Sequence, residues 1–171
     1  MNVFDFAMKM ETDGKGFYEK LARESTIAGL KTIFLRLAQD EQKHYEVFLA
    51  LKNQTQMATM EDSTSLEDSE NVFAGLLEGK EGSGPVKGDL EGYRYAMKIE
   101  ADSFRLYEDA AKREKNVEVK NLLLKIAEEE HKHFIIVENI FNFVNAPKQY
   151  LAWREFSNLD EFRNFGRDVD I

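Results

Sequence analysis

The sequence predicts an all-α protein: an antiparallel four-helix bundle made of two helical hairpins that a long crossover joins, with a short C-terminal extension. Three observations predict this fold. Apolar residues recur at helical spacing in four long segments, the two prolines (Pro85 and Pro147) lie outside those segments, and the two halves of the chain resemble each other at an offset of 89 residues. A chain of 171 residues can bury one substantial core, so we expect one bundle domain over residues 1–147.

The first predicted hairpin pairs a helix over about residues 3–23 with a helix over about residues 29–52. The apolar stripe of the first helix consists of Phe4, Ala7, Tyr18 and Leu21. The stripe of the second helix consists of Leu30, Phe34, Leu37, Tyr45 and Phe48. Because the connection between them is short, the two helices should be antiparallel neighbours.

The second predicted hairpin pairs helices over about residues 89–113 and 118–144. Asp89 is a candidate N-cap for the first of these helices, because its carboxylate can accept a hydrogen bond from a free backbone N–H group. The second helix ends before Pro147. Their apolar stripes consist of Tyr93, Met97, Phe104 and Tyr107, and of Leu122, Leu123, Ile126, Phe134, Val137 and Phe141. Residues 5–52 align with residues 94–141 without a gap, which indicates a duplicated hairpin.

Two segments lie outside the predicted helices. Residues 53–88 are rich in Ser, Thr, Asp, Glu and Gly, and one apolar cluster among them predicts a short helix over about residues 69–77. A disordered linker is the alternative; we favour a crossover because the repeat requires both hairpins to share one core. Residues 148–171 carry five aromatic residues that could cover the end of the bundle or a partner subunit: Tyr150, Trp153, Phe156, Phe162 and Phe165.

The composition excludes several classes of function. A formal net charge of −9 and a pI near 5.0 differ from the clustered Lys and Arg residues of a nucleic-acid-binding surface. The chain has no Cys, which excludes disulfides, thiolate metal ligands and iron–sulfur clusters. No stretch approaches the roughly 20 apolar residues of a membrane helix, and residues 1–10 lack a signal-peptide pattern. We therefore expect a cytoplasmic protein that binds neither nucleic acid nor membranes.

The strongest functional signal is a four-residue pattern that occurs once in each half of the chain. It consists of Glu11, Tyr18, Glu41 and His44 in the first half, and of Glu100, Tyr107, Glu130 and His133 in the second. Residues three apart on a helix project from the same face, and each Glu-x-x-His pair continues the apolar stripe of its helix. Four glutamates in an apolar interior would be very costly as unpaired anions, and two divalent metal ions would neutralise them. The predicted metal ligands are Glu11, Glu41, His44, Glu100, Glu130 and His133.

Glu128 and His131 form a competing pair with the same spacing, interleaved with Glu130 and His133. The two pairs face different sides of the helix, so one site cannot use both. The repeat favours Glu130 and His133, because the first-half position that matches His131 is Gln42. We therefore predict that His131 is a solvated surface residue.

Four further residues are candidates for contacts with the metal ligands. Tyr18 and Tyr107 could be ordinary core residues, or they could hydrogen-bond the ligand carboxylates. Asp40 and Glu129 directly precede the motif glutamates and could be surface charges. We favour the interpretation that they accept the free ring N–H of the ligand histidines across the helix pair, which would fix the histidine tautomer.

These residues resemble those of the ferritin-like superfamily, and within it the rubrerythrin-like di-iron carboxylate proteins. In ferritin-like proteins, one Glu from each of two helices and a Glu-x-x-His from each of the other two hold the metal pair. The resemblance covers about residues 3–52 and 89–144. It implies two iron ions, with manganese suited to the same ligands. It also implies that Glu41 and Glu130 bridge both metals, and that the shells are completed by Glu11 with His44 and by Glu100 with His133.

Two features depart from the family pattern. Many rubrerythrins carry a rubredoxin-like four-Cys iron site, whereas this chain has no Cys, so a separate electron-donor protein would have to supply reductant. Rubrerythrins also place an extra Glu one turn after the lone Glu of the third helix, where this chain has Ser103. The matching position in the first half is Gly14.

The resemblance implies a non-haem di-iron oxidoreductase that reduces hydrogen peroxide or dioxygen at a ferrous pair, in defence against oxidative stress. The missing four-Cys site favours an alternative, an iron-binding protein or ferroxidase without sustained turnover. A bundle with a structural metal site is a third interpretation. The expected partners are a small-molecule oxidant and an electron donor, and the family resemblance together with the aromatic tail favours a homodimer.

Overall fold

The computed structural model describes residues 3–53, 63–65 and 90–145, and four long helices account for nearly all of them. The helices are α1 (Val3–Glu24), α2 (Ala28–Asn53), α4 (Leu90–Arg113) and α5 (Val117–Asn145). Each helix end lies within one residue of the predicted end, and the described residues contain no strand. The all-α prediction is therefore confirmed. The predicted helix over about residues 69–77, the candidate cap Asp89 and the extension 148–171 lie outside the described residues.

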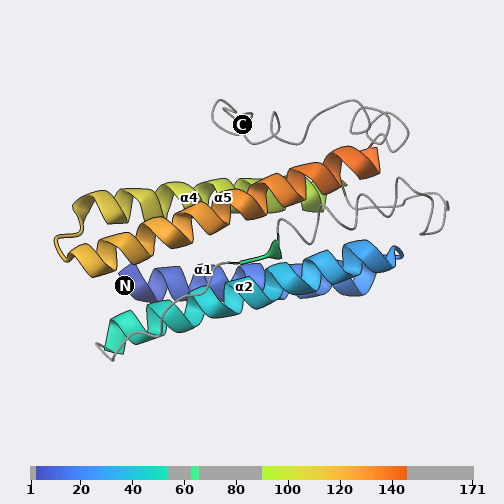
Figure 1. The fold of residues 1–171 in the computed structure, drawn as a ribbon. Coiled ribbons are helices and arrows are strands. Elements are labelled where there is room, and N and C mark those ends of the chain that lie inside the picture. Colours follow the sequence, from blue (N-terminus) through green and yellow to red (C-terminus); the bar gives the residue numbers. More distant parts are fainter. Residues whose placement is uncertain (1–2, 54–62, 66–89, 146–171) are drawn as a thin grey trace.

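The four helices form a bundle of two hairpins (Figure 1). α1 packs along α2, and α4 packs along α5. The α1–α2 connection lies at one end of the bundle and the α4–α5 connection at the opposite end (Figure 1). Each helix consequently runs antiparallel to its neighbours, and further contacts join α2 to α5 and α1 to α4. This is the antiparallel arrangement that the short connections predicted.

A side-chain cap that helical periodicity does not reveal sets the start of α5. Oδ1 of Asn116 accepts hydrogen bonds from the backbone N–H groups of Glu118, at 2.9 Å, and Val119, at 3.3 Å. Asn is a favoured N-cap residue because it satisfies N–H groups that have no partner within the helix. α5 therefore begins at Val117, one residue before the predicted start.

The apolar core consists of two clusters, one towards each end of the bundle. The first packs around Phe34, Leu37 and Ile136, and the second around Phe48 and Ile126; these five side chains are almost completely buried. Along every helix, residues of one cluster precede the predicted metal ligands and residues of the other cluster follow them. The ligand positions therefore lie between two apolar clusters that shield them from solvent.

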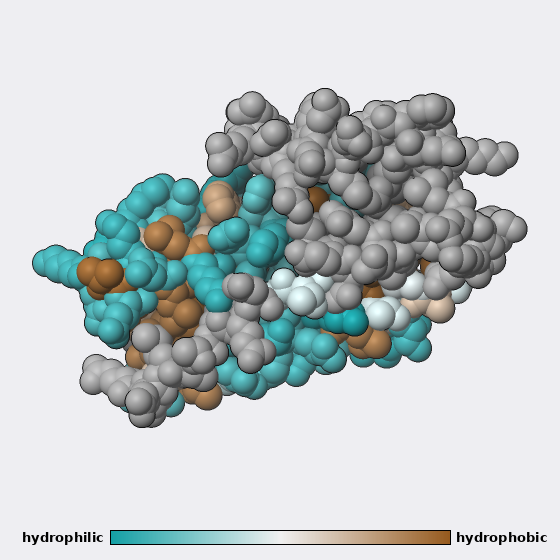
Figure 2. All heavy atoms as spheres, viewed as in Figure 1, coloured by the Kyte–Doolittle hydropathy of each residue, from teal (hydrophilic) through white to brown (hydrophobic). Residues whose placement is uncertain are grey.

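The outer surface of the described helices is mostly hydrophilic on the face that Figure 2 shows. Apolar side chains appear there as separate brown patches among teal ones, at the left-hand end and along the lower edge of the view. Val117, at the start of α5, is the most exposed large apolar residue described, at 68 %. Within the described ranges, no helix has the length and apolar character that crossing a bilayer requires.

Candidate metal centre

The structure brings six ionisable side chains from all four helices to the middle of the bundle. They are Glu11 of α1, Glu41 and His44 of α2, Glu100 of α4, and Glu130 and His133 of α5. None of them is more than 3 % exposed, although four are carboxylates. Burial of several unpaired anions is strongly unfavourable, so these residues, hereafter the central cluster, require protons or cations.

The helical repeat explains why these residues share one face. Glu41 and His44 are three residues apart, which places them about 60° apart around α2 and about 4.5 Å apart along its axis. They continue the buried stripe that includes Phe34 and Leu37. The Glu-x-x-His pair of α5 stands in the same relation to the buried residue Ile126.

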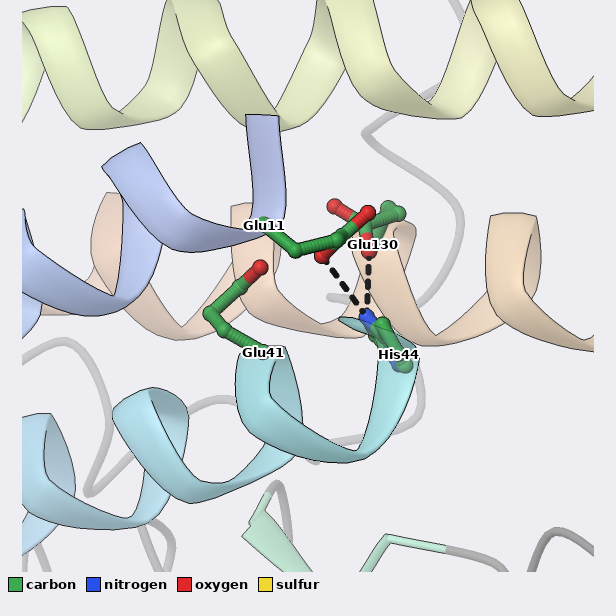
Figure 3. A group of neighbouring side chains, drawn as sticks. All are labelled: Glu11, Glu41, His44 and Glu130. Atoms are coloured by element: carbon green, nitrogen blue, oxygen red, sulfur yellow. Dashed lines mark ion pairs between the residues drawn. The ribbon is translucent and has the colours of Figure 1, made fainter. Parts of the chain in front are cut away.

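The central cluster forms two overlapping groups of candidate ligands. The first group contains Glu11, Glu41, His44 and Glu130, and the second contains Glu41, Glu100, Glu130 and His133. Within each group, one nitrogen or oxygen atom of every residue lies within 4.8 Å of the others. Figure 3 shows the first group converging from α1, α2 and α5. Glu41 and Glu130 belong to both groups, so their carboxylates could contact two ions.

The two histidines make equivalent contacts, because their partners are residues that correspond in the 89-residue repeat. Nδ1 of His44 lies 2.8 Å from Oε1 of Glu130 and 3.4 Å from Oε2 of Glu11 (Figure 3). The corresponding contacts of His133 Nδ1 are 3.2 Å to Glu41 Oε1 and 3.7 Å to Glu100 Oε2. Each histidine thus faces the lone glutamate of its own hairpin and the motif glutamate of the other hairpin.

Six of the seven described buried side-chain atoms that lack a hydrogen-bond partner mark where metal ions fit, and the seventh, His133 Nε2, faces Asp40 instead. Among the described residues there are seven such side-chain atoms, and all belong to the central cluster: Glu11 Oε2, Glu41 Oε1, His44 Nδ1, Glu100 Oε2, Glu130 Oε1, His133 Nδ1 and His133 Nε2. Buried polar atoms in proteins are rarely left unpaired. Carboxylate oxygens and imidazole nitrogens suit iron and manganese, and two divalent cations would balance four carboxylate charges. The residues present therefore fit a pair of divalent metal ions.

The second ring nitrogen of each histidine faces a carboxylate of the other hairpin. His44 Nε2 lies 3.1 Å from Glu129 Oε2, which is a hydrogen-bond distance. His133 Nε2 lies 3.6 Å from Asp40 Oδ2, which is longer than a hydrogen bond. Asp40 and Glu129 are each 2 % exposed, so neither is a surface charge. A hydrogen bond from Nε2–H to Glu129 leaves the lone pair of His44 Nδ1 free to bind a metal ion.

Two tyrosines donate hydrogen bonds across the bundle to the lone glutamates. The Tyr18 hydroxyl of α1 donates to Oε1 of Glu100 in α4, and the Tyr107 hydroxyl of α4 donates to Oε1 of Glu11 in α1. Both tyrosines are almost completely buried. Each lone glutamate consequently uses one oxygen for a tyrosine and keeps the other, Oε2, without a hydrogen-bond partner.

Burial and mutual repulsion shift the pKa values of the central cluster. Burial, reinforced by the neighbouring glutamates, raises the pKa values of Glu41 and Glu130 well above their usual range. Burial alone would lower the pKa values of His44 and His133, but contacts with carboxylates outweigh it and raise both pKa values well above the usual range. Burial also favours a higher pKa for Glu11, but the contact with His44 prevails and the pKa of Glu11 is lowered. Without cations the cluster therefore holds protons, and metal ions would have to displace them.

The competing pair on α5 lies outside both groups of candidate ligands. Glu128 is exposed, whereas His131 is half-buried, with its ring 5.8 Å from that of Phe104. His131 is therefore solvated only in part, because α4 packs beside this position of α5 and covers part of the imidazole.

Two serines that the sequence pattern did not reveal also reach the carboxylates behind the histidines. Ser63 and Ser65, in the segment interpreted as a crossover, are 8 % and 5 % exposed. Both hydroxyls donate to Oδ2 of Asp40, and the backbone N–H of Ser63 donates to Oε1 of Glu129 at 3.1 Å. Serine is common in solvated connections and has no periodic spacing there, so the sequence carries no signal for these contacts.

The sequence model of the Rubrerythrin family matches residues 2–141, a range that includes all six residues of the central cluster. Searches of curated proteins and of solved structures gave no match. The family match spans most of the chain, and the observed helical bundle with its buried carboxylates and histidines agrees with it. The chain therefore belongs to the Rubrerythrin family, whose members have a ferritin-like di-iron domain.

Proposed function

We propose that this protein is a di-iron carboxylate oxidoreductase that reduces hydrogen peroxide, or dioxygen, in defence against oxidative stress. One observation carries the proposal: every residue of the central cluster presents a buried atom without a hydrogen-bond partner, and these atoms gather in two overlapping groups. Their number, type and charge suit two ferrous ions, and manganese would suit the same atoms. Membership of the Rubrerythrin family supports iron.

The proposed ligands of one ion are Glu11 and His44, those of the other ion are Glu100 and His133, and Glu41 and Glu130 are shared. When bound, a ferrous pair would supply two electrons which, with two protons taken up from solvent, reduce one hydrogen peroxide to two waters. The chain holds the ligand atoms in place on four rigid helices, between two apolar clusters that exclude water. The hydrogen bond from His44 Nε2–H to Glu129 directs Nδ1 towards the metal position.

Tyr18 and Tyr107 hold protons next to two of the proposed ligands. Burial and the charges of nearby glutamates raise the pKa values of both phenols well above the usual value of 10.0. Both hydroxyls therefore stay protonated at neutral pH and act as donors. By binding one oxygen of Glu100 and one of Glu11, they orient the other oxygen of each carboxylate towards the metal position.

A cavity of about 100 Å³ between α1 and α4 offers a small oxidant a route to the centre. Its lining includes Glu100, which is a proposed ligand, the tyrosine bound to it (Tyr18), and Gly14. Tyr95, which is 55 % exposed, brings the lining to the protein surface. One water occupies about 30 Å³ in the liquid, so the cavity has room for hydrogen peroxide, whereas pockets for larger organic ligands measure about 300 Å³ or more. The cavity therefore has room for the small oxidant that the proposal requires.

The proposed reaction can be tested by mixing anaerobic, ferrous-loaded protein rapidly with hydrogen peroxide. One equivalent of peroxide should oxidise both ferrous ions of each chain within seconds. The His133→Ala variant should bind fewer ions and react slowly, because it lacks a proposed ligand. His131→Ala is the matched control, since His131 lies on the same helix but outside the central cluster, and it should react like the wild type. Fully loaded wild-type protein that stays ferrous would contradict the proposal.

A second candidate function is iron handling, in which the protein binds or oxidises iron without sustained turnover. The absence of Cys favours it, because the chain has no rubredoxin-like site through which electrons could return. An external reductant distinguishes the two functions. Peroxide consumption over many turnovers supports the oxidoreductase and a separate electron-donor protein. A single turnover per iron pair, unchanged by reductant, supports iron handling.

A further inference from the structure

Residues 63–65 contact both carboxylates that lie behind the histidines of the central cluster. Figure 1 shows this stretch as a short green piece between segments drawn in grey. Ser63 and Ser65 are buried, whereas Thr64 is exposed. A buried hydroxyl group requires a hydrogen-bond partner, and here both hydroxyls donate to the same atom, Oδ2 of Asp40. In addition, the Ser63 hydroxyl oxygen accepts a hydrogen bond from the backbone N–H of Ser65 at 3.1 Å.

The stretch contacts the two carboxylates in different ways. Glu129 accepts from the backbone N–H of Ser63, at 3.1 Å, and this contact does not depend on the serine side chain. Asp40 instead accepts from the hydroxyl groups of Ser63 and Ser65, and its other oxygen, Oδ1, accepts from Lys43 Nζ at 2.7 Å. Substitution of the two serine side chains therefore changes the surroundings of Asp40 and preserves the hydrogen bond to Glu129.

The position of the Asp40 carboxylate affects the surroundings of His133. Asp40 Oδ2 lies 3.6 Å from His133 Nε2, a buried nitrogen that has no hydrogen-bond partner. The side chain of Lys43 is 48 % exposed, so without the hydroxyls the ion pair with Lys43 would draw the carboxylate towards solvent and away from His133. His44, in contrast, faces Glu129 at 3.1 Å. Loss of the hydroxyls should therefore affect the half of the metal centre that His133 serves.

We propose that Ser63 and Ser65 are positioning residues, whose hydroxyl groups hold the Asp40 carboxylate beside His133 and so raise the metal affinity of that half of the centre. This role rests on the proposed function, because it presupposes that the central cluster binds metal. Carboxylates that accept the free ring N–H of a ligand histidine contribute about 10- to 100-fold to metal affinity, and the 3.6 Å contact between Asp40 and His133 is longer than such a hydrogen bond, so we use the lower end of this range. Removal of both hydroxyls should weaken binding at His133 about tenfold and leave binding at His44 unchanged.

The test adds zinc stepwise to the nitrogen-15-labelled full-length chain and follows each imidazole by NMR. The sequence has three histidines, so each half of the metal centre has its own probe and His131 is an internal reference. In the Ser63→Ala/Ser65→Ala variant, the zinc concentration that half-saturates the His133 signal should rise about tenfold, while the His44 curve stays in place. The Ser63→Thr/Ser65→Thr variant retains both hydroxyls and should restore wild-type binding. Thr64→Ala, at the exposed position between the serines, is the matched control.

Four outcomes would overturn the proposal: equal weakening at both histidines, unchanged binding at His133, tighter binding at His133, or failure of the threonine variant to restore it. A double-mutant cycle adds a further test, because the serine substitutions should have no additional effect in an Asp40→Ala background. If the serine substitutions weaken zinc binding further in the Asp40→Ala background, the serines do not act through Asp40. Wild-type protein that binds no zinc would contradict the metal centre itself, which separates failure of the proposed function from failure of the serine role.

Discussion

The glycine at position 14 leaves room for a carboxylate of the central cluster. A Cβ atom added at Gly14 would lie 3.3 Å from Oε2 of Glu41, which is closer than about nine in ten such contacts in proteins. At Gly16, in the same helix, an added Cβ would meet no atom within 4 Å. The two glycines therefore differ in kind: the helix would accept a side chain at position 16, whereas at position 14 the buried carboxylate of Glu41 would have to move.

Substitution of these two glycines by alanine should have different effects on metal binding. Gly16→Ala should raise the free energy of unfolding by about 0.5–1 kcal/mol, since alanine loses less backbone entropy in a helix, and should not change metal affinity. Gly14→Ala should lower the affinity for a pair of manganese or ferrous ions by about threefold to tenfold, because Glu41 must shift away from its position. Thermal unfolding and binding isotherms would measure both effects. Equal metal affinities in the two variants would contradict this role of Gly14.

At the scale of the helix, register decides which charged residues enter the core. Glu128 and Glu130 are two residues apart on α5, and residues two apart project about 200° from each other around a helix. Accordingly, Glu130 is 1 % exposed, and Glu128 faces solvent. The spacing of Glu128 and His131 is the same as that of Glu130 and His133, so spacing alone could not select the buried pair. The 89-residue repeat selects it, because Glu130 and His133 match residues that lie on the apolar face of α2.

The register predicts opposite effects for two alanine substitutions on α5. Glu130→Ala should abolish binding of the metal pair, because it removes a carboxylate that both groups of candidate ligands share. Glu128→Ala should bind as many ions as the wild type. Metal analysis of protein purified anaerobically would measure the ions bound per chain. Thermal unfolding of metal-free Glu130→Ala serves as the control for folding, because a cooperative transition shows that the metal is lost with the carboxylate and not through an unfolded chain. Equal metal loss in both variants would contradict the assignment of Glu130, and not Glu128, as the metal ligand on α5.

At the scale of the whole molecule, neither hairpin contains a complete site. Each hairpin supplies two glutamates and one histidine, and the contacts that complete the arrangement cross between hairpins. The imidazole of His44 faces Glu129 and Glu130 of α5, and the Tyr18 hydroxyl binds Glu100 of α4. Formation of the centre therefore requires docking of the two hairpins. Because the metal-free cluster holds protons, the stability of the docked bundle should depend on pH.

Metal-free protein should lose stability as the pH rises. The folded-state pKa values of Glu41, Glu130, His44 and His133 are raised, so the stabilisation from their bound protons is complete below the unfolded values, 4.5 for glutamate and 6.5 for histidine. It disappears as the pH rises through the raised values. Urea unfolding should therefore give a smaller free energy of unfolding at about pH 9 than at about pH 6. A metal-free protein whose stability rises over this range would contradict the raised pKa values.

The central cluster lowers stability as the pH rises. The carboxylates of Asp40 and Glu129, and also bound metal, should instead raise stability as the pH rises. The pKa values of Asp40 and Glu129 are lowered, because contacts with histidines outweigh the effect of burial, so their stabilisation is present above their usual pKa values and is lost in acid below them. Metal ions bind deprotonated ligands, so the stabilisation that excess manganese adds should grow with pH over the range where the metal-free protein weakens. Unfolding curves with manganese and with a chelator would measure this difference. A constant difference across the pH range would argue against proton displacement by metal.

The sequence by itself determined the four helices and the six residues that meet in the middle of the bundle. Helix ends and faces depend on local periodicity, and the repeat showed which Glu and His residues share a register. Only the tertiary structure decided the surroundings of those residues: the burial of Asp40 and Glu129, the hydrogen bonds from the tyrosines to the opposite hairpin, and the serine contacts of Ser63 and Ser65. These contacts join residues that are distant in the chain. No local pattern encodes them, because the packing of one hairpin on the other selects which side chains meet.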